Sequence, residues 1–426
     1  MRAPDPPDDD TPWHRYGPAA AGAAGWLAVL VLAVGTVHTA VGDPSAGLDL
    51  RPVRAAGTAL RTGHPIYGVP RFVYPPPAAL VGWVESYLPV RTDVAVVTAL
   101  EVLGVAATVL LFHRCLRPHR WSLPIGALVT VLLLEGDLLA GVLWLDNASV
   151  LLLVPCAVVL RLWGRGRWAA GAAVLAATFL VKPVLVALVA VPVAWRRWRT
   201  ALLAVAVPAG VVGMAVVASG NLASALRIGV RLDGGSILVG RQSVYNLSLA
   251  GLRDRHHLDG TLVGLLRLAV VAGAALVVVR CARRRITVTP VTVGAAGALA
   301  LSTVFLAGPL SEDHYLLLLL PGALAAADGS SRAARVLLAG ALALAGYPSS
   351  ILPAMGPVAH QVAYVGIELL ILVASALTLA STGPGTGTPR TGERADDALP
   401  STAAEHTGPD GPVGPGDRSQ TVGSTR

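Results

Sequence analysis

The sequence predicts an all-α, polytopic integral membrane protein, and its composition and its apolar segments carry that prediction. Of the 426 residues, 54% are hydrophobic and only 14% are charged, and the mean hydropathy is +0.64. A water-soluble domain of this length has no core large enough for so much apolar surface. Apolar segments recur from about Ala19 to Ala380, many of them near the length of about 20 residues with which a helix crosses about 30 Å of hydrocarbon. Because lipid offers the backbone no hydrogen-bond partner, we expect these segments to be helices.

The first apolar segment, Ala19 to Val41, is expected to be a retained membrane helix. It is long, lacks a clear small-residue cleavage site and is followed by further apolar segments, unlike a signal peptide. The cysteines, Cys115, Cys156 and Cys281, are far apart in or beside apolar segments. We interpret them as packing residues, not as a disulfide framework or metal ligands.

The charged connections predict the orientation in the membrane. The net charge is +8 and the pI is about 9.9, but the arginines lie in short clusters between apolar segments, which favours membrane orientation over nucleic-acid binding. By the positive-inside rule the basic clusters are cytoplasmic: residues 113–120, 161–167, 196–199, 280–285 and 330–335. Connections that hold acids alternate with them and are expected outside: residues 42–50, 135–147, 220–260 and 309–315. This alternation predicts about 12 transmembrane helices with both termini inside.

Composition also predicts the limits of the membrane domain. Residues 1–17 and 382–426 are rich in Pro, Gly, Thr, Asp and Ser, so we expect disordered cytoplasmic tails on either side of a membrane domain at 18–381. Outer loops are expected at about 42–89 and 220–260. Within the first, residues 74–89 are short, begin with three prolines and carry Glu85, which favours a re-entrant or in-plane helix over a membrane crossing.

Asp49 is the first candidate for chemistry. It lies a few residues beyond the predicted end of the first helix, before a stretch with helical spacing at Val53, Ala56 and Leu60. The alternative is that Asp49 is only the N-cap of that short helix. The same loop has four arginines on the side where arginine is disfavoured, which predicts a negative group close by: Arg51, Arg54, Arg61 and Arg71.

Several short motifs, taken in order, resemble those of glycosyltransferase family 87. The motifs are "DL" (49–50), "AGTALRTGHPIY" (56–67), "FVYPPPAAL" (72–80), "KPVLVALVAVPVAWRRWR" (182–199), "RQSVYNLSLAGL" (241–252) and "GPLSEDHYLLLLLP" (308–321). This family consists of integral-membrane transferases of the C-type superfamily that take sugars from polyprenyl-phosphate donors. The resemblance implies the C-type architecture, with short helices in the outer first loop.

The resemblance assigns roles to single residues. Asp49 matches the first-loop aspartate that is proposed as the general base in inverting transfer, and partial shielding from water should raise its pKa toward a useful value. Lys182 is the only lysine of the chain and precedes Pro183 at the end of a predicted helix. The family's corresponding lysine is a ligand for the lipid phosphate, and the ammonium is expected to reach headgroup level. The alternative is that Lys182 merely anchors a helix end.

Further residues complete the expected site. Arg241 is a second donor-phosphate candidate, with a solvated loop arginine as the alternative. The substrate-binding candidates are Tyr74, Glu312, Asp313 and His314, although acids at a helix start also act as caps. Where relatives show Gly-Gln-x-Asn, this chain reads "LWLDNASVLLL". The acceptor candidates in and near that stretch are Glu135, Asp137, Asp146 and Asn147, of which the first two are also possible rivals for the base.

Together these features predict a multi-pass glycosyltransferase of a bacterial plasma membrane with its active site on the outer face. Heavy use of Ala, Arg and Gly with one lysine indicates a GC-rich bacterium. The expected donor is polyprenyl-phosphate mannose and the acceptor a glycan or glycolipid. No metal or cofactor is expected, because cationic side chains hold lipid monophosphates. The alternatives are an arabinofuranosyltransferase or, in another class, a transporter or flippase for lipid-linked sugars, which should place charges near mid-membrane.

Overall fold

The chain is helical throughout the part that the computed structural model describes. This part comprises residues 12–112, 121–136, 145–218, 246–309, 311–327, 330–346 and 357–382, with residues 139, 143 and 223 in addition. The chain divides into two units, Met1–Gly385 and Thr386–Arg426, and the second lies wholly outside the described residues. No strand occurs in the described ranges, so the predicted all-α class is confirmed there.

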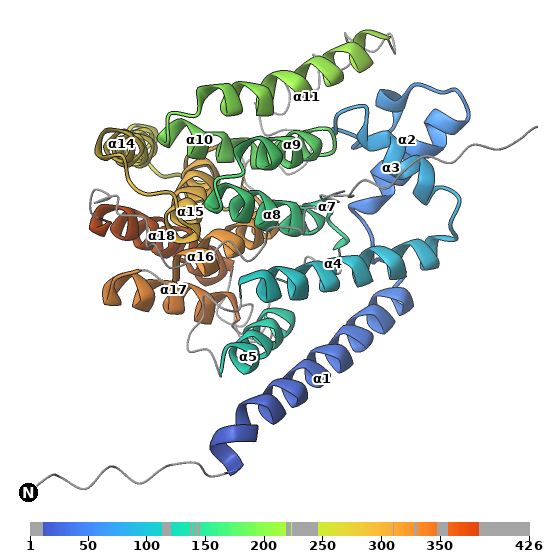
Figure 1. Ribbon diagram of the computed structural model, residues 1–426. Helices are drawn as coiled ribbons and strands as arrows, with labels where there is room; N and C mark the ends of the chain where they lie inside the picture. The colour runs from blue at the N-terminus through green and yellow to red at the C-terminus, as the bar shows by residue number, and fades with distance from the viewer. Residues whose placement is uncertain are drawn as a thin grey trace, which may run out of the picture. The chain divides into compact units, whose positions relative to one another are not determined.

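The helices, with η for 3-10 helices, follow one another from the N-terminus (Figure 1). They are α1 (Pro12–Gly42), α2 (Leu50–Arg61), η1 (Ile66–Gly68), α3 (Ala78–Glu85), α4 (Val90–Phe112), α5 (Ser122–Glu135), α7 (Ala148–Leu151), α8 (Leu153–Gly164), α9 (Trp168–Phe179), η3 (Pro183–Val189), α10 (Ala190–Ala194), α11 (Trp198–Ala218), α13 (Leu249–His256), α14 (Gly260–Arg284), α15 (Pro290–Ala307), η4 (Asp313–Leu319), α16 (Leu320–Ala327), α17 (Arg332–Ala345) and α18 (Pro357–Ser381).

Six of the described helices are long and apolar enough to cross a membrane: α1, α4, α11, α14, α15 and α18. Shorter apolar helices lie between them, including α5, α9, and the continuous pairs η3–α10 and η4–α16. The structure therefore supports a polytopic membrane protein, and the count of about twelve crossings stays a prediction. α3 has only eight residues, about 12 Å of helix, which is too short to cross the hydrocarbon layer.

The N-terminal boundary differs from the prediction. α1 begins at Pro12, so it includes residues 12–17 of the predicted disordered tail. Proline suits the first position of a helix because its fixed φ is helical and its missing N–H is not needed there. Composition alone does not predict this helix start, since proline is also typical of disordered segments. At the other end, α18 finishes at Ser381, and the predicted end of the membrane domain stays a prediction.

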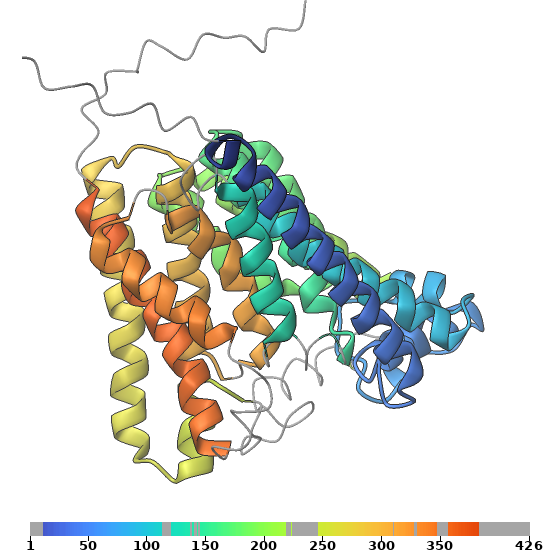
Figure 2. The same ribbon diagram turned by 90° about the horizontal axis from the view of Figure 1, so that it is seen from below.

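Small residues let the central helices approach closely. α15 is the most buried of the candidate spans and packs against α8, α16 and α18. A Cβ added at Gly294 of α15 would lie 2.4 Å from Cβ of Ala325 in α16. Backbone contact of this kind is how membrane helices gain packing energy without a hydrophobic driving force. By contrast, α14 lies at the edge of the bundle beside α18 (Figure 2). Large apolar side chains along α14 are exposed.

α2 and α3 cross in close contact towards the C-terminal end of α1 (Figures 1 and 2). A Cβ added at Gly57 would lie 1.9 Å from the carbonyl carbon of Gly82, and one added at Gly82 would lie 1.9 Å from the carbonyl oxygen of Val53. Only glycine at both positions permits this approach.

Arg54 fixes this helix pair to α4. Its guanidinium donates to the backbone oxygen of Glu85 at 2.7 Å, to that of Leu88, and to Oδ2 of Asp93 at 2.8 Å. Asp93 is thus a negative partner for one of the outer-loop arginines. Arg51 donates to the backbone oxygen of Pro44 instead, and Arg61 lies over the ring of Tyr87. The prediction of a negative group near the outer-loop arginines is therefore confirmed for Arg54, whereas the partners of Arg51 and Arg61 are neutral.

Replacing Gly57 with alanine is expected to destabilise the protein by about 1–3 kcal/mol, because the added methyl group overlaps the backbone of α3. Thermal unfolding of the purified protein in detergent measures the change. The control is Gly68→Ala in the same loop, where an added Cβ meets nothing within 4 Å. Equal melting temperatures for the two variants would contradict the close crossing of α2 and α3.

Candidate active site

Asp49 is located at the N-cap position of α2, but its side chain makes no capping hydrogen bond. Its backbone N–H donates to Leu145 at 3.0 Å, and its Oδ2 accepts a hydrogen bond from Nδ2 of Asn147 at 2.5 Å. The carboxylate therefore faces the start of α7, a segment almost a hundred residues away in the chain. Asp49 therefore occupies the cap position of α2, but its side chain does not act as a cap.

Lys182 is buried between α9 and η3, with 9% of its surface exposed. Its Nζ donates to Oδ1 of Asn147 at 3.1 Å and to Oγ of Ser149 at 2.6 Å. The rings of Tyr74 and Tyr315 lie 5.6 and 5.2 Å from the ammonium, within cation–π range. A side chain that anchors a helix end keeps its ammonium in water, whereas this one turns into the protein. The ammonium is therefore buried within the protein, and its expected reach to headgroup level stays a prediction.

The amide of Asn147 joins these two charged groups. Its nitrogen donates to Asp49, and its oxygen accepts from Lys182 and, at 3.0 Å, from the backbone N–H of Ser149, where it caps α7. The carboxylate and the ammonium are thus held next to each other through one neutral side chain. In the described part of the chain neither of them forms a direct ion pair.

A second charged pair borders this group at the start of η4. Nε2 of His314 lies 3.0 Å from Oε2 of Glu312. The imidazole packs edge-on against Tyr315, which stacks on Phe305 of α15. Glu312 is at the N-cap position of η4 without a side-chain capping bond, so its carboxylate is also used elsewhere. Glu312, His314 and Lys182 are close enough to Asp49 for their charges to act on it.

Tyr74 connects the α2–α3 region to the site. Its ring packs against a small apolar cluster that includes Phe72, and its backbone oxygen accepts from the hydroxyl of Tyr67 at 3.2 Å. Its other neighbour is the Lys182 ammonium. The "YPPP" segment therefore positions an aromatic face against the buried lysine.

Burial and neighbouring charges shift the pKa values of Asp49 and Glu312 in opposite directions. Burial raises the pKa of Asp49, and the Asn147 hydrogen bond and the charge of His314 only partly oppose it. For Glu312, burial also raises the pKa, but the charge and hydrogen bond of His314 and the charge of Lys182 outweigh it and lower the pKa overall. Glu312 is therefore held ionised, while Asp49 is poised to accept a proton, which is how sites assign acid and base roles to similar groups.

The acceptor candidates differ in placement. Asp146 is buried beside the site, at a left-handed φ of 51°, and its Oδ1 accepts from Thr98 of α4 at 2.8 Å. Burial raises the pKa of Asp146 to about 7. Glu135 ends α5 with an exposed side chain and is not part of the hydrogen-bonded group. Asp137 and Arg241 lie outside the described residues, as does the side chain of Asp313, the first residue of η4.

Two buried residues of this region escaped the sequence analysis. Ser149 is a ligand of the Lys182 ammonium, and no feature of "DNASV" distinguishes it in the sequence. Glu101 lies inside α4, is fully buried, and neither carboxyl oxygen has a partner among the described residues. A lone acid within an apolar run is a signal for a functional residue in a membrane helix and would have found Glu101. Glu368 in α18 is a second such acid.

These observations define a helical integral membrane protein with a buried polar site built from an acid, an amide and an ammonium. Residues 72–228 match the model of glycosyltransferase family 87. The match confirms the resemblance to this family over these residues. It covers more than a third of the chain and includes Tyr74, Asn147 and Lys182, whereas Asp49 and Glu312 lie outside it. Neither the curated proteins nor the solved structures gave a match.

Replacing Asp49 with asparagine is expected to stabilise the protein by a few degrees at pH 7.5. A raised pKa means that ionisation of Asp49 destabilises the folded state. This destabilisation is absent below the ordinary pKa near 4, grows as the pH rises from there, and is complete above the raised pKa. Asparagine at position 49 can still accept from Asn147 and has no charge to bury. Melting temperatures from pH 4 to 8 should converge for the two proteins on the acid side.

The matched control is Asp254→Asn, since Asp254 pairs with Arg253 on α13. This variant should show no gain at pH 7.5. A lower melting temperature for Asp49→Asn at neutral pH would contradict the assignment of Asp49 as a desolvated carboxylate.

Proposed function

We propose that the protein transfers one sugar from a polyprenyl-phosphate donor to a hydroxyl group of a glycan or glycolipid, on the outer face of a bacterial plasma membrane. The single observation that carries this proposal is the buried Asp49–Asn147–Lys182 group, in which a carboxylate lies close to an ammonium, and an ammonium is a group that suits a phosphate. Mannose is the proposed sugar, and arabinofuranose is the alternative from the same family.

The residues suggest an inverting displacement. Asp49 takes the proton of the acceptor hydroxyl, the acceptor oxygen bonds to the anomeric carbon, and the bond from that carbon to the phosphate oxygen breaks. The lipid phosphate leaves with the bonding electron pair, and Lys182 faces the added charge. An ammonium has three donors, and two are used by Asn147 and Ser149, which leaves one for a phosphate oxygen. Arg241 remains proposed as a second phosphate contact.

The surrounding groups support this role. Tyr74 and Tyr315 flank the ammonium with aromatic faces that exclude water and strengthen the attraction between Lys182 and a phosphate. The Glu312–His314 pair adds a substrate-facing acid and imidazole, with Asp313 beside them in sequence. Asp146 and Asn147 are proposed to contact the acceptor, and Glu135 and Asp137 remain further acceptor candidates.

The rival function is a transporter for lipid-linked sugars, and one observation favours it. Glu101 and Glu368 are buried acids inside candidate spans, and intramembrane acids often mark transport pathways. A transporter moves the intact donor between leaflets without turnover, so product analysis separates the two functions.

Asp49→Ala and Lys182→Ala are each expected to lower kcat by about a hundredfold or more, because a general base contributes about 10²–10⁴-fold. The assay uses purified protein with radiolabelled polyprenyl-phosphate mannose and, separately, polyprenyl-phosphate arabinose, followed by linkage analysis of the product. Asp254→Asn is the control and should keep full turnover. Undiminished transfer by Asp49→Ala would sink the proposed mechanism, and donor translocation without product would favour the transporter.

A further inference from the structure

Glu368 of α18 is a buried carboxylic acid with a single partner. It is fully buried in the candidate span Gln361–Ser381, and its Oε1 accepts a hydrogen bond from Oγ of Ser311 at 3.1 Å. Its Oε2 is buried without a partner among the described residues. An acid is costly inside a membrane helix, so such a residue usually has a function.

A second polar residue lies two turns away on the same face of α18. Nε2 of Gln361 donates to the backbone oxygen of Asn246 at 3.0 Å, and its Oε1 lies 3.1 Å from Nε2 of His256. Gln361 is also fully buried. α18 therefore holds two segments that are distant in sequence, one ending the "RQSVYN" motif and one starting the "SEDHY" motif.

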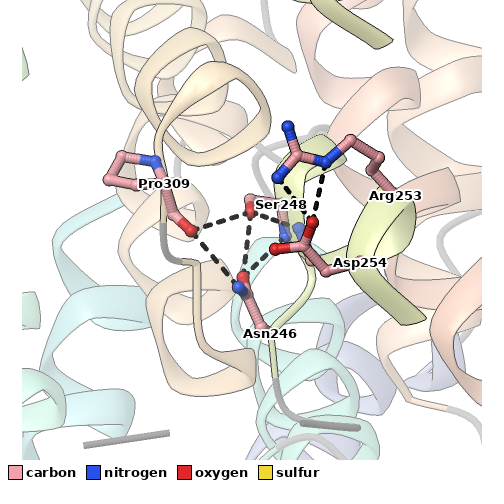
Figure 3. Close-up of polar contacts among 6 residues, drawn as sticks. Asn246, Ser248, Arg253, Asp254 and Pro309 are labelled. Atoms are coloured by element: carbon pink, nitrogen blue, oxygen red, sulfur yellow. Dashed lines mark hydrogen bonds and ion pairs between the residues drawn. The ribbon is translucent and has the colours of Figure 1, made fainter. Parts of the chain in front are cut away.

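These two segments are bound directly to each other. The backbone N–H of Leu247 donates to the oxygen of Ser311 at 2.6 Å, and the N–H of Ser311 donates to Oδ1 of Asn246 at 3.2 Å. Nδ2 of Asn246 donates to the backbone oxygen of Pro309 at 3.2 Å, and Ser248 donates to the same Asn246 oxygen (Figure 3). The Asn246 amide thus uses both of its ends to fix one loop on the other.

Ser311 immediately precedes the charged part of the site. Glu312 is the next residue, and its carboxylate pairs with His314, whose charge acts on Asp49. Because Ser311 is fixed through its N–H, its carbonyl and its hydroxyl, the chain enters η4 in one defined position.

We propose that Glu368, through Ser311, is a positioning residue for the Glu312–His314 pair, with the Asn246 amide as the second support. The proposal rests on the proposed function only for its kinetic readout. Glu368 touches neither the reacting atoms nor Lys182 in this arrangement. Its role is to hold the start of η4 so that the imidazole meets the carboxylate of Glu312.

The test compares Glu368→Gln, which keeps an acceptor oxygen for Ser311, with Glu368→Leu, which does not. Glu368→Leu is expected to lower kcat roughly tenfold, as for the loss of one net hydrogen bond in the transition state, and to leave KM for the donor nearly unchanged. Glu368→Gln should recover most of that loss. Ser311→Ala removes the same bond with a smaller change in volume and replaces Glu368→Leu if the latter does not fold.

A readout without turnover separates this proposal from the proposed function. The rate at which diethyl pyrocarbonate modifies His314, followed by mass spectrometry, should rise severalfold in Glu368→Leu and in Ser311→Ala, because the imidazole is released from Glu312. The control is Ser375→Ala, another buried polar residue of α18, which should match the parent protein in both measurements. Unchanged His314 reactivity in folded Glu368→Leu and Ser311→Ala overturns the proposal, whatever the activity of Asp49→Ala.

Discussion

The hydrogen bonds of the Asn147 amide are the interaction on which the site depends. A carboxylate and an ammonium in direct contact would neutralise each other, and neither would be available to a substrate. The neutral amide keeps Asp49 and Lys182 adjacent without joining them, because it can donate to an acid and accept from a cation at the same time. An aspartate in its place would lose the donor to Asp49, and a leucine would leave Lys182 with Ser149 alone and remove the amide partner of the Asp49 carboxylate.

The fold brings these groups together by starting helices at one place. Asp49, Asn147, Lys182 and Glu312 each occupy the N-cap position of a helix, namely α2, α7, η3 and η4. Only Asn147 uses its side chain as a cap, so the others are free to face one another. In a membrane protein, irregular backbone is tolerated where it lines a protein interior, and helix starts supply it. The short helices around the site are therefore part of its construction.

The sequence predicted the class of fold and the main charged residues, but not their contacts. Apolar content and segment length indicate membrane helices whatever their packing, which is why the all-α prediction holds. The partners of Asn147 lie 98 and 35 residues away, and hydropathy carries no information on such pairing. For the same reason the burial of Lys182 could not be predicted, since it depends on Ser149 and two tyrosine rings from other segments. Segments of about a dozen apolar residues fall below the length at which composition separates spans from buried helices.

The resting site is electrostatically incomplete, and this favours a reaction over a purely structural role. Asp49 and Lys182 are both withdrawn from water, yet their hydrogen-bond partners are neutral amide and hydroxyl groups. Burial therefore raises the pKa of Asp49, and its ionised form carries a desolvation cost. Binding of a phosphate would give Lys182 a direct anionic partner, and uptake of a proton would relieve Asp49. Both changes belong to the proposed transfer, so the free energy stored in forming the site is recovered as the reaction proceeds. A group serving only to hold helices together would gain nothing from leaving its charges unpaired.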